Sequence, residues 1–141
     1  WHLLQDERHA GVQRLVRDLN LLYRQQPALH ARDCESSGFS WLVARDAEQS
    51  VFAWLRHDGD RGQVMVVCNF TPVPREGYRI GLPDGTRAWR EVLNTDAAAY
   101  GGGNLGNASA RICPQSAPAH GHASSISINL PPLATVFLVA E

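Results

Sequence analysis

The chain divides into one stretch with helical periodicity and a longer stretch of short alternating runs. From about His9 to Arg24 apolar residues recur at intervals of three and four, a spacing that places side chains on one face of a helix. We predict an amphipathic helix here, with an apolar stripe formed by Val12, Leu15, Val16, Leu19, Leu22 and Tyr23. Asp6 and Glu7 precede it, where the helix dipole favours negative charge, and Pro27 ends it.

After Pro27 the apolar residues fall into short runs of period two, bounded by turn residues, which is typical of strands. We predict strands near residues 39–43, 51–57, 64–70, 77–82, 89–93, 111–113, 125–130 and 135–139. Many short strands with turn punctuation indicate an antiparallel sandwich. The expected fold class is therefore mainly β, an antiparallel β-sandwich of about seven or eight short strands preceded by one amphipathic α-helix.

Two of these strands carry informative alternation. In the third, Val64, Val66 and Cys68 share one face and Met65, Val67 and Asn69 the other. We therefore expect it to be buried on both faces, and to end at Pro72 and Pro74, which cannot donate to a sheet ladder. In the first, strict alternation would put one set of three residues on one face, namely Phe39, Trp41 and Val43, and another on the opposite face, namely Ser40, Leu42 and Ala44.

Turn residues punctuate the rest of the chain. Asp58-Gly59 and Asp84-Gly85 are the strongest signals, because glycine accepts positive φ and aspartate bonds its own backbone, and we expect both to close hairpins. Residues 97–110 are too rich in glycine for regular structure and predict a long surface loop. Residues 114–125 form a second irregular stretch.

Composition excludes several partners. All thirteen basic residues are arginines, spread from Arg8 to Arg111 without a cluster, and the net charge is -1, so nucleic acid and anionic membranes are poor partners. Three cysteines at irregular spacing disfavour a disulfide-stapled secreted domain, and we expect a cytoplasmic setting. The longest apolar stretch, residues 134–140, is too short to span a bilayer.

Four motifs follow one another along the chain. They are Gly-Val-Gln-Arg-Leu-Val-Arg-Asp-Leu-Asn at 11–20, Asn-Phe-Thr-Pro-Val-Pro-Arg at 69–75, Arg-Glu-Val-Leu-Asn-Thr-Asp at 90–96 and Leu-Pro-Pro-Leu-Ala-Thr at 130–135. With these motifs the chain resembles, from Trp1 to Ala140, the C-terminal part of bacterial 1,4-α-glucan (glycogen) branching enzymes of the α-amylase superfamily. The loop from Asp96 to Asn107 also matches the family pattern Asp-Ala-Ala-x-Tyr-Gly-Gly-x-x-x-Gly-Asn. Trp1 is not an initiator residue, so we expect the chain to begin inside a longer translation product.

The resemblance implies a parent glycosyltransferase that cuts an α-1,4 glucan, holds the chain covalently and transfers it to a 6-hydroxyl without a cofactor. Residues 1–30 would then be the last helical segment of a (β/α) barrel that is missing here, and residues 31–141 its C-terminal all-β domain. The family's catalytic aspartate and glutamate precede the matched region, so no catalytic residue is assigned and the fragment is expected to be inactive alone. The implied partners are the barrel of the same polypeptide and α-1,4-glucan or glycogen.

The resemblance also suggests which residues face the barrel. Part of the helical stripe would face it, and its candidates are Val12, Leu15, Val16 and Leu19. The segment after the third strand has two interpretations. In the favoured one, its prolines end a buried strand and Phe70 packs at a domain junction; in the other, Arg75 and Tyr78 reach the barrel.

Other candidate chemistry is weak in this sequence. Retaining glycosyl transfer needs two carboxylates about 5 Å apart, and the acids here fall mostly in turns and polar segments. His120 and His122 lack a third ligand at a familiar spacing, so no metal site is predicted. The glycine-rich loop at 101–107 differs from a P-loop, because no Gly-Lys-Ser/Thr follows and the chain has no lysine.

The tryptophans are the best binding candidates, because sugar rings present C–H faces that stack on exposed aromatic rings. Trp54 lies in a strongly apolar strand and is expected in the core, whereas Trp89 is ambiguous. Trp41 is the candidate glucan contact, with core or domain-interface packing as the alternative.

Three functions therefore compete. The chain is an accessory domain of a branching enzyme, an autonomous carbohydrate-binding module, or a purely structural interaction domain. The helix separates the first two, since a free-standing module has no need of its apolar stripe.

Overall fold

The computed structural model describes residues 1–85 and 87–141, and within them it contains one long helix and eight strands. The helix is α1 (Glu7–Gln25), and short 3-10 turns occur at η1 (His2–Gln5), η2 (Pro27–Leu29), η3 (Ser36–Gly38) and η4 (Ala98–Tyr100). The strands are β1 (Phe39–Asp46), β2 (Val51–His57), β3 (Gln63–Asn69), β4 (Arg75–Leu82), β5 (Trp89–Asn94), β6 (Arg111–Ile112), β7 (Ser124–Leu130) and β8 (Ala134–Ala140). The predicted fold class is confirmed, and each predicted strand is present.

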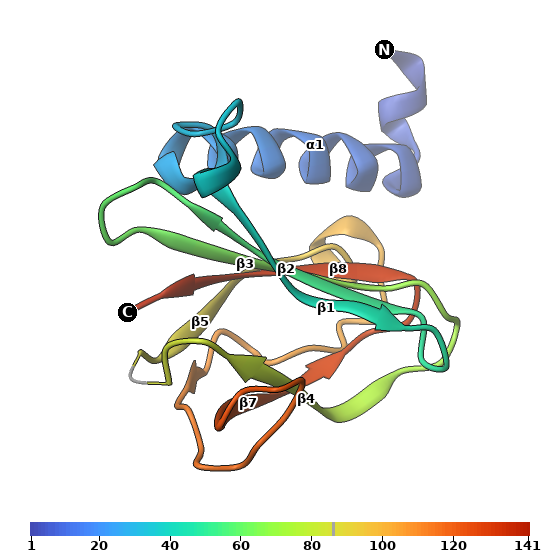
Figure 1. Cartoon of the computed structure of the whole chain (residues 1–141). Helices are drawn as coiled ribbons and strands as arrows, with labels where there is room; N and C mark the ends of the chain where they lie inside the picture. Colours follow the sequence, from blue (N-terminus) through green and yellow to red (C-terminus); the bar gives the residue numbers. More distant parts are fainter. Residues whose placement is uncertain (86) are drawn as a thin grey trace.

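The elements form three layers (Figure 1). The main sheet is antiparallel with strand order β1-β2-β3-β8-β5-β6, and β4 pairs with β7 in a second, two-stranded sheet. The two sheets enclose the main core, and its largest fully buried members include Trp89, Met65, Ile80, Ile126 and Leu138. Helix α1 lies over the other face of the main sheet. The main sheet is therefore covered from both sides.

Strand β3 is buried on both faces, as predicted. Met65 and Val67 belong to the core between the sheets, whereas Val64, Val66 and Cys68 form a second cluster on the outer face with Ala28. A groove of about 570 Å³ remains between α1 and this outer face, lined by Leu19, Leu22, Tyr23, Trp54, Val66 and Phe137. The helix therefore covers the face without filling all the space beneath it.

Two local expectations are wrong. Asp58-Gly59 does join the hairpin strands β2 and β3, but Asp84-Gly85 closes no hairpin, because β4 pairs with β7 and β5 pairs with β8 and β6. The second turn carries the chain from one sheet to the other. Val43 does not share a face with Trp41, because a register irregularity separates them and both Leu42 and Val43 enter the core.

Asn69 fixes the proline-rich segment that follows β3. Its side-chain amide donates to the carbonyls of Val73 (2.9 Å) and Pro131 (3.0 Å), and its Oδ1 accepts from the backbone N–H (3.1 Å) and hydroxyl (2.8 Å) of Thr71. The side chain is fully buried, and these four bonds use both its donors and both its acceptor lone pairs. The distinctive sequence at 69–74 is thus a loop closed on a single buried amide.

The loop of residues 96–107, which we call the docking loop, holds α1 against the β domain. Arg14 Nε donates to the Ala99 carbonyl (2.7 Å), and the Tyr100 hydroxyl donates to Asp18 (3.0 Å). Gly11 is buried beneath the loop, and a Cβ there would lie 2.5 Å from the carbonyl oxygen of Tyr100. The Gly11 to Asp18 part of the helix is therefore shaped to fit this loop.

The docking loop is itself built on buried polar side chains of β5. Glu91 accepts from the backbone N–H (3.1 Å) and side-chain amide (2.8 Å) of Asn107, and Asn94 donates to the Leu105 carbonyl (2.5 Å). The Asp96 carboxylate accepts from the N–H groups of Gly103 (2.9 Å) and Leu105 (3.1 Å). The glycine-rich stretch predicted as a surface loop is consequently well ordered by hydrogen bonds.

Replacing Asn69 by aspartate should destabilise the protein strongly. Aspartate cannot donate to the carbonyls of Val73 and Pro131 and would bury a charge beside them, so we expect a loss of about 2–4 kcal/mol in the free energy of unfolding, measured by urea denaturation. Thr71→Val, which removes one hydroxyl from the same network, should cost about 1 kcal/mol. A smaller loss for Asn69→Asp than for Thr71→Val would contradict the assigned role.

Gly11→Ala should also destabilise the protein, although alanine has a higher helix propensity than glycine. Alanine favours a helix over glycine by about 1 kcal/mol, but its methyl group would displace Tyr100, and overpacking costs about 1–3 kcal/mol. We expect a lower midpoint in urea denaturation. Gln13→Ala on the exposed side of the same helix is the control and should change stability little. A stabilised Gly11→Ala variant would mean that the loop does not constrain the helix.

Candidate functional site

Five aromatic rings form a continuous cluster on the outer face of the main sheet, near its β1 edge. Trp41 contacts Phe39 edge-on (centroids 5.0 Å apart) and lies 6.0 Å from Trp54 and 6.2 Å from Phe52. Phe52 in turn meets Phe70 edge-on at 5.8 Å. Phe52 and Trp54 are two residues apart on β2, and Trp41 is paired directly with Trp54, so strand geometry puts these rings on one face. We call these five residues the aromatic face.

Trp41 is the ring of this face best suited to bind a ligand. The residue is 53% exposed, although three neighbouring rings support its side chain. An exposed ring with fixed neighbours offers a flat apolar surface and an indole N–H at little further cost in conformational entropy. Of the other tryptophans, Trp54 is half-buried at the margin of the outer-face cluster and Trp89 is buried between the sheets. The residue chosen from the sequence is therefore accessible.

The predicted helical stripe divides between two directions. Leu15 and Leu19 are half-buried, and Leu19 lines the groove between α1 and the sheet. Val12 and Val16 are 59% and 51% exposed. Only part of the stripe is therefore available to another domain, because the β domain occupies the rest.

The three remaining interface candidates differ in the same way. Phe70 is exposed at the end of the aromatic face, and half-buried Arg75 donates to the carbonyl of Gln49 (3.3 Å). Tyr78 is only 6% exposed, and its hydroxyl donates to Asp46 at 2.6 Å. Burial raises the pKa of Tyr78, and the Asp46 carboxylate raises it further. The structural interpretation fits Tyr78 better, because its ring lies inside the sandwich and not on a surface that a barrel could reach.

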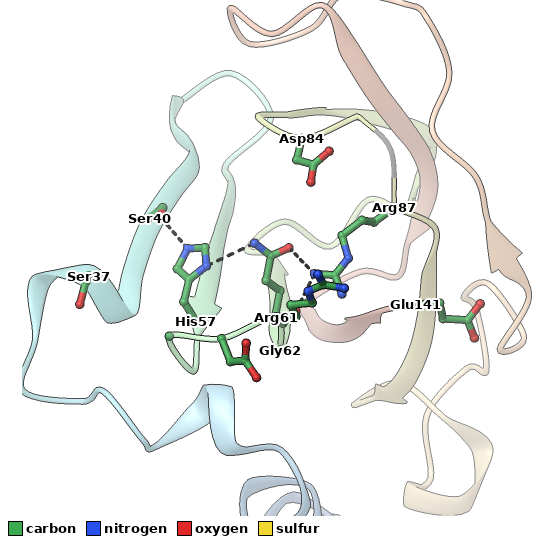
Figure 2. A pocket seen from close by; sticks show the side chains of 11 residues that line it. Ser37, Ser40, His57, Arg61, Gly62, Asp84, Arg87 and Glu141 are labelled. Carbon is green, nitrogen blue, oxygen red and sulfur yellow. Dashed lines mark hydrogen bonds between the residues drawn. The ribbon is translucent and has the colours of Figure 1, made fainter.

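A polar hollow of about 940 Å³ lies at one end of the sandwich (Figure 2). Within it, His57 Nε2 is 2.7 Å from Ser40 Oγ, while Nδ1 lies 3.4 Å from the amide nitrogen of Gln63. Arg87 donates to the amide oxygen of Gln63 (3.4 Å) and to the Arg61 carbonyl (2.6 Å). A serine beside a histidine resembles part of a hydrolase triad. The pair can activate the serine only if the histidine accepts the hydrogen bond from the serine hydroxyl.

The directions of these hydrogen bonds are opposite to the ones that nucleophilic catalysis requires. Arg87 can only donate, so the Gln63 oxygen faces it and the Gln63 amide N–H groups face His57 Nδ1. His57 therefore carries its proton on Nε2 and donates to Ser40, whereas a general base must accept from the serine. Burial lowers the pKa of His57, and the charge of Arg56 lowers it further, which favours this neutral form. The chain of bonds ties β1, β2 and β3 to the β4–β5 connection.

Several other polar residues serve the backbone. Asp58 caps its turn by accepting from the N–H groups of Asp60 (2.8 Å) and Gly62 (3.0 Å). His120 and Gly121 have φ of 49° and 81° and form the turn between the bridged residues Ala119 and His122. Within residues 1–85 and 87–141 no three His, Cys, Asp or Glu side chains are grouped to hold a metal ion. The helices of the described chain are also too short or too polar to cross a membrane.

The sequence did not predict the contact between the docking loop and α1. It also did not predict the series of hydrogen bonds that links Ser40, His57, Gln63 and Arg87. The spacing of Gly11 and Tyr100 gave no signal, because the contact joins residues far apart in sequence. Ser40, His57 and Gln63 come from three strands whose register brings them together.

Comparison with known proteins now adds the family. Residues 41–141 match the model of the alpha amylase C-terminal all-beta domain. The chain is 56% identical over 140 residues to the 1,4-alpha-glucan branching enzyme GlgB of Ralstonia nicotianae, covering 98% of this chain and 18% of that protein. It is 56% identical over 141 residues to the enzyme of the same name from Paraburkholderia xenovorans, covering 100% and 19%, and 54% identical to that of Pseudomonas putida, covering 98% and 18%.

These relatives are much longer, and the chain spans less than one fifth of their length. The fold, the four motifs and the identity along the whole chain agree on one conclusion. The chain belongs to the family of alpha-amylase C-terminal all-beta domains, in the form found at the C-terminal end of 1,4-α-glucan branching enzymes.

Proposed function

We propose that the chain is the non-catalytic accessory region of a glycogen branching enzyme, which supports the catalytic barrel and contacts glucan through Trp41. The parent enzyme would form α-1,6 branches by transglycosylation, with its catalytic carboxylates in the barrel and a cytoplasmic location. The observation that carries the glucan contact is the exposure of Trp41 on a base of packed rings. Glucan offers the matching surface, since its sugar rings are apolar on their faces and polar at their edges.

The barrel contact is supported by the way α1 is held. The docking loop fixes one side of the helix, while Val12 and Val16 on the helix are each more than half exposed. We propose that residues 1–30 complete the barrel and that these two valines, with Phe70 and Arg75, meet it. This arrangement argues against an autonomous carbohydrate-binding module, because in such a module Val12 and Val16 would be exposed apolar residues with no domain to pack against.

A structural domain without sugar affinity is the remaining alternative, and Trp41→Ala distinguishes it. We expect this variant to lose most of the retention that the unaltered chain shows in native gels containing glycogen, because stacking on one aromatic ring contributes about 1–3 kcal/mol by analogy with base stacking. Trp1→Ala is the matched control, since Trp1 is 94% exposed and lies immediately before η1 at the start of the chain. Unchanged retention for Trp41→Ala would remove the proposed glucan contact.

The exposed helix face should make the chain associate or bind a hydrophobic dye. Val12→Gln with Val16→Gln should lower dye fluorescence and shift sedimentation toward the monomer, while the free energy of unfolding changes by less than about 0.5 kcal/mol each, as is usual for surface positions. Leu22→Gln is the contrasting variant, because Leu22 is buried and its replacement should destabilise the fold. A chain that is monomeric and binds no dye before substitution would count against the barrel-facing surface.

A further inference from the structure

Two grooves meet along the edge strand β1. One, of about 600 Å³, follows residues 41–48 from Trp41 to Glu48 and is also lined by His120. The other, of about 610 Å³, runs past Arg75, Tyr78 and Arg79 on β4. Asp46 and His120 line both grooves. The surface beside Trp41 therefore continues as a channel around the edge of the sandwich.

The strand that borders this channel can offer backbone hydrogen bonds. β1 is the first strand of the main sheet and pairs only with β2 among the described strands, and an edge strand presents unpaired N–H and C=O groups. Register irregularities after Trp41 and after Val43 break its regular spacing, which disfavours the addition of another strand. The free groups suit a ligand with many hydroxyls better than they suit an extended peptide.

Asp46 supplies acceptors at the junction of the two grooves. Its Oδ2 accepts from the Tyr78 hydroxyl (2.6 Å) and its Oδ1 from the Gln49 N–H (3.1 Å). A carboxylate has about four lone-pair positions, so each oxygen can accept one further bond. The two existing bonds hold the carboxylate in one orientation.

His120 supplies a donor at the same junction. Its Nδ1 accepts from the Gly81 N–H (3.3 Å), so the ring proton is on Nε2. The ring lies against Tyr78, with centroids 6.2 Å apart, and the residue is exposed. A fixed acceptor and a fixed donor thus lie together, and neighbouring hydroxyls of one sugar ring can both donate and accept.

We propose that an α-1,4-glucan chain stacked on Trp41 continues along β1 and hydrogen-bonds Asp46 and His120. This rests on the proposed function, in which Trp41 contacts glucan. Trp41 pairs with Trp54 and Asp46 with Val51, so the register irregularities of β1 reduce their separation along the sheet to three residues of β2, or about 10 Å at the usual rise. The channel therefore takes more than one glucose unit, and a disaccharide with one ring stacked on Trp41 does not reach its far end.

The test compares maltose with maltoheptaose, titrated into the chain and followed by NMR. His120→Gly removes the imidazole without adding backbone strain, since His120 has φ of 49° and glycine tolerates positive φ. We expect it to weaken maltoheptaose binding about 3–10-fold, the worth of one hydrogen bond, and to leave maltose binding within about twofold. Ala108→Gly, at φ of 50° immediately after the docking loop, is the matched backbone control and should change neither. Maltoheptaose should also shift the amide of Gly81, and maltose should not.

The outcomes separate the two proposals. If Trp41→Ala abolishes binding of both sugars while His120→Gly behaves like Ala108→Gly and Gly81 does not respond, the channel is wrong and the Trp41 contact stands. If Trp41→Ala changes neither affinity, the glucan contact itself fails and the channel fails with it. Equal weakening of both sugars by His120→Gly would also overturn the channel, because a distal contact must depend on chain length.

Discussion

The burial of β3 on both faces is the constraint on which the rest of the structure depends. A strand whose five inner residues, 64–68, are all apolar cannot lie in a sheet that faces water on one side. Sheet β4–β7 covers one face, and α1 with η2 covers the other. The helix is thus a required part of the β domain, and the loop that fixes it is as important to the fold as either sheet.

That cover is incomplete, and the surfaces of functional interest lie where it ends. Trp41, Phe52 and Phe70 of the aromatic face are exposed near the β1 edge, and Phe39 beside them is half-buried. These rings pack against one another in place of a second layer. The exposure of Trp41 is therefore not a defect of packing. It follows from the way the sandwich leaves this face of β1 and β2 open.

The sequence was sufficient for the strands, because period-two alternation and turn residues are local signals. Pairing was harder: Asp84-Gly85 specifies a turn but not the strand that its neighbours join, and the irregularity at Val43 arises from the register with β2. For the candidate site, Trp41 could be chosen by residue type and position, but its supporting rings depend on cross-strand pairing. The bonds of His57 with Ser40 and Gln63, and the fit of Gly11 under Tyr100, join residues that only the fold brings together.

The contact between α1 and the docking loop separates two meanings of the word domain. The family match begins at residue 41, which is where the sequence pattern shared with other members of the family begins. The boundary of folding lies much earlier, because a polypeptide trimmed to the matched residues would leave Val66 and Phe137 without their cover and Tyr100 without its partner Asp18. If residues 41–141 were transferred to another enzyme, α1 would therefore have to be transferred with them. Otherwise the new enzyme would need its own helix with a glycine at the position of Gly11, where Tyr100 packs. In this chain the helical segment that precedes the family match therefore also covers the outer face of the main sheet.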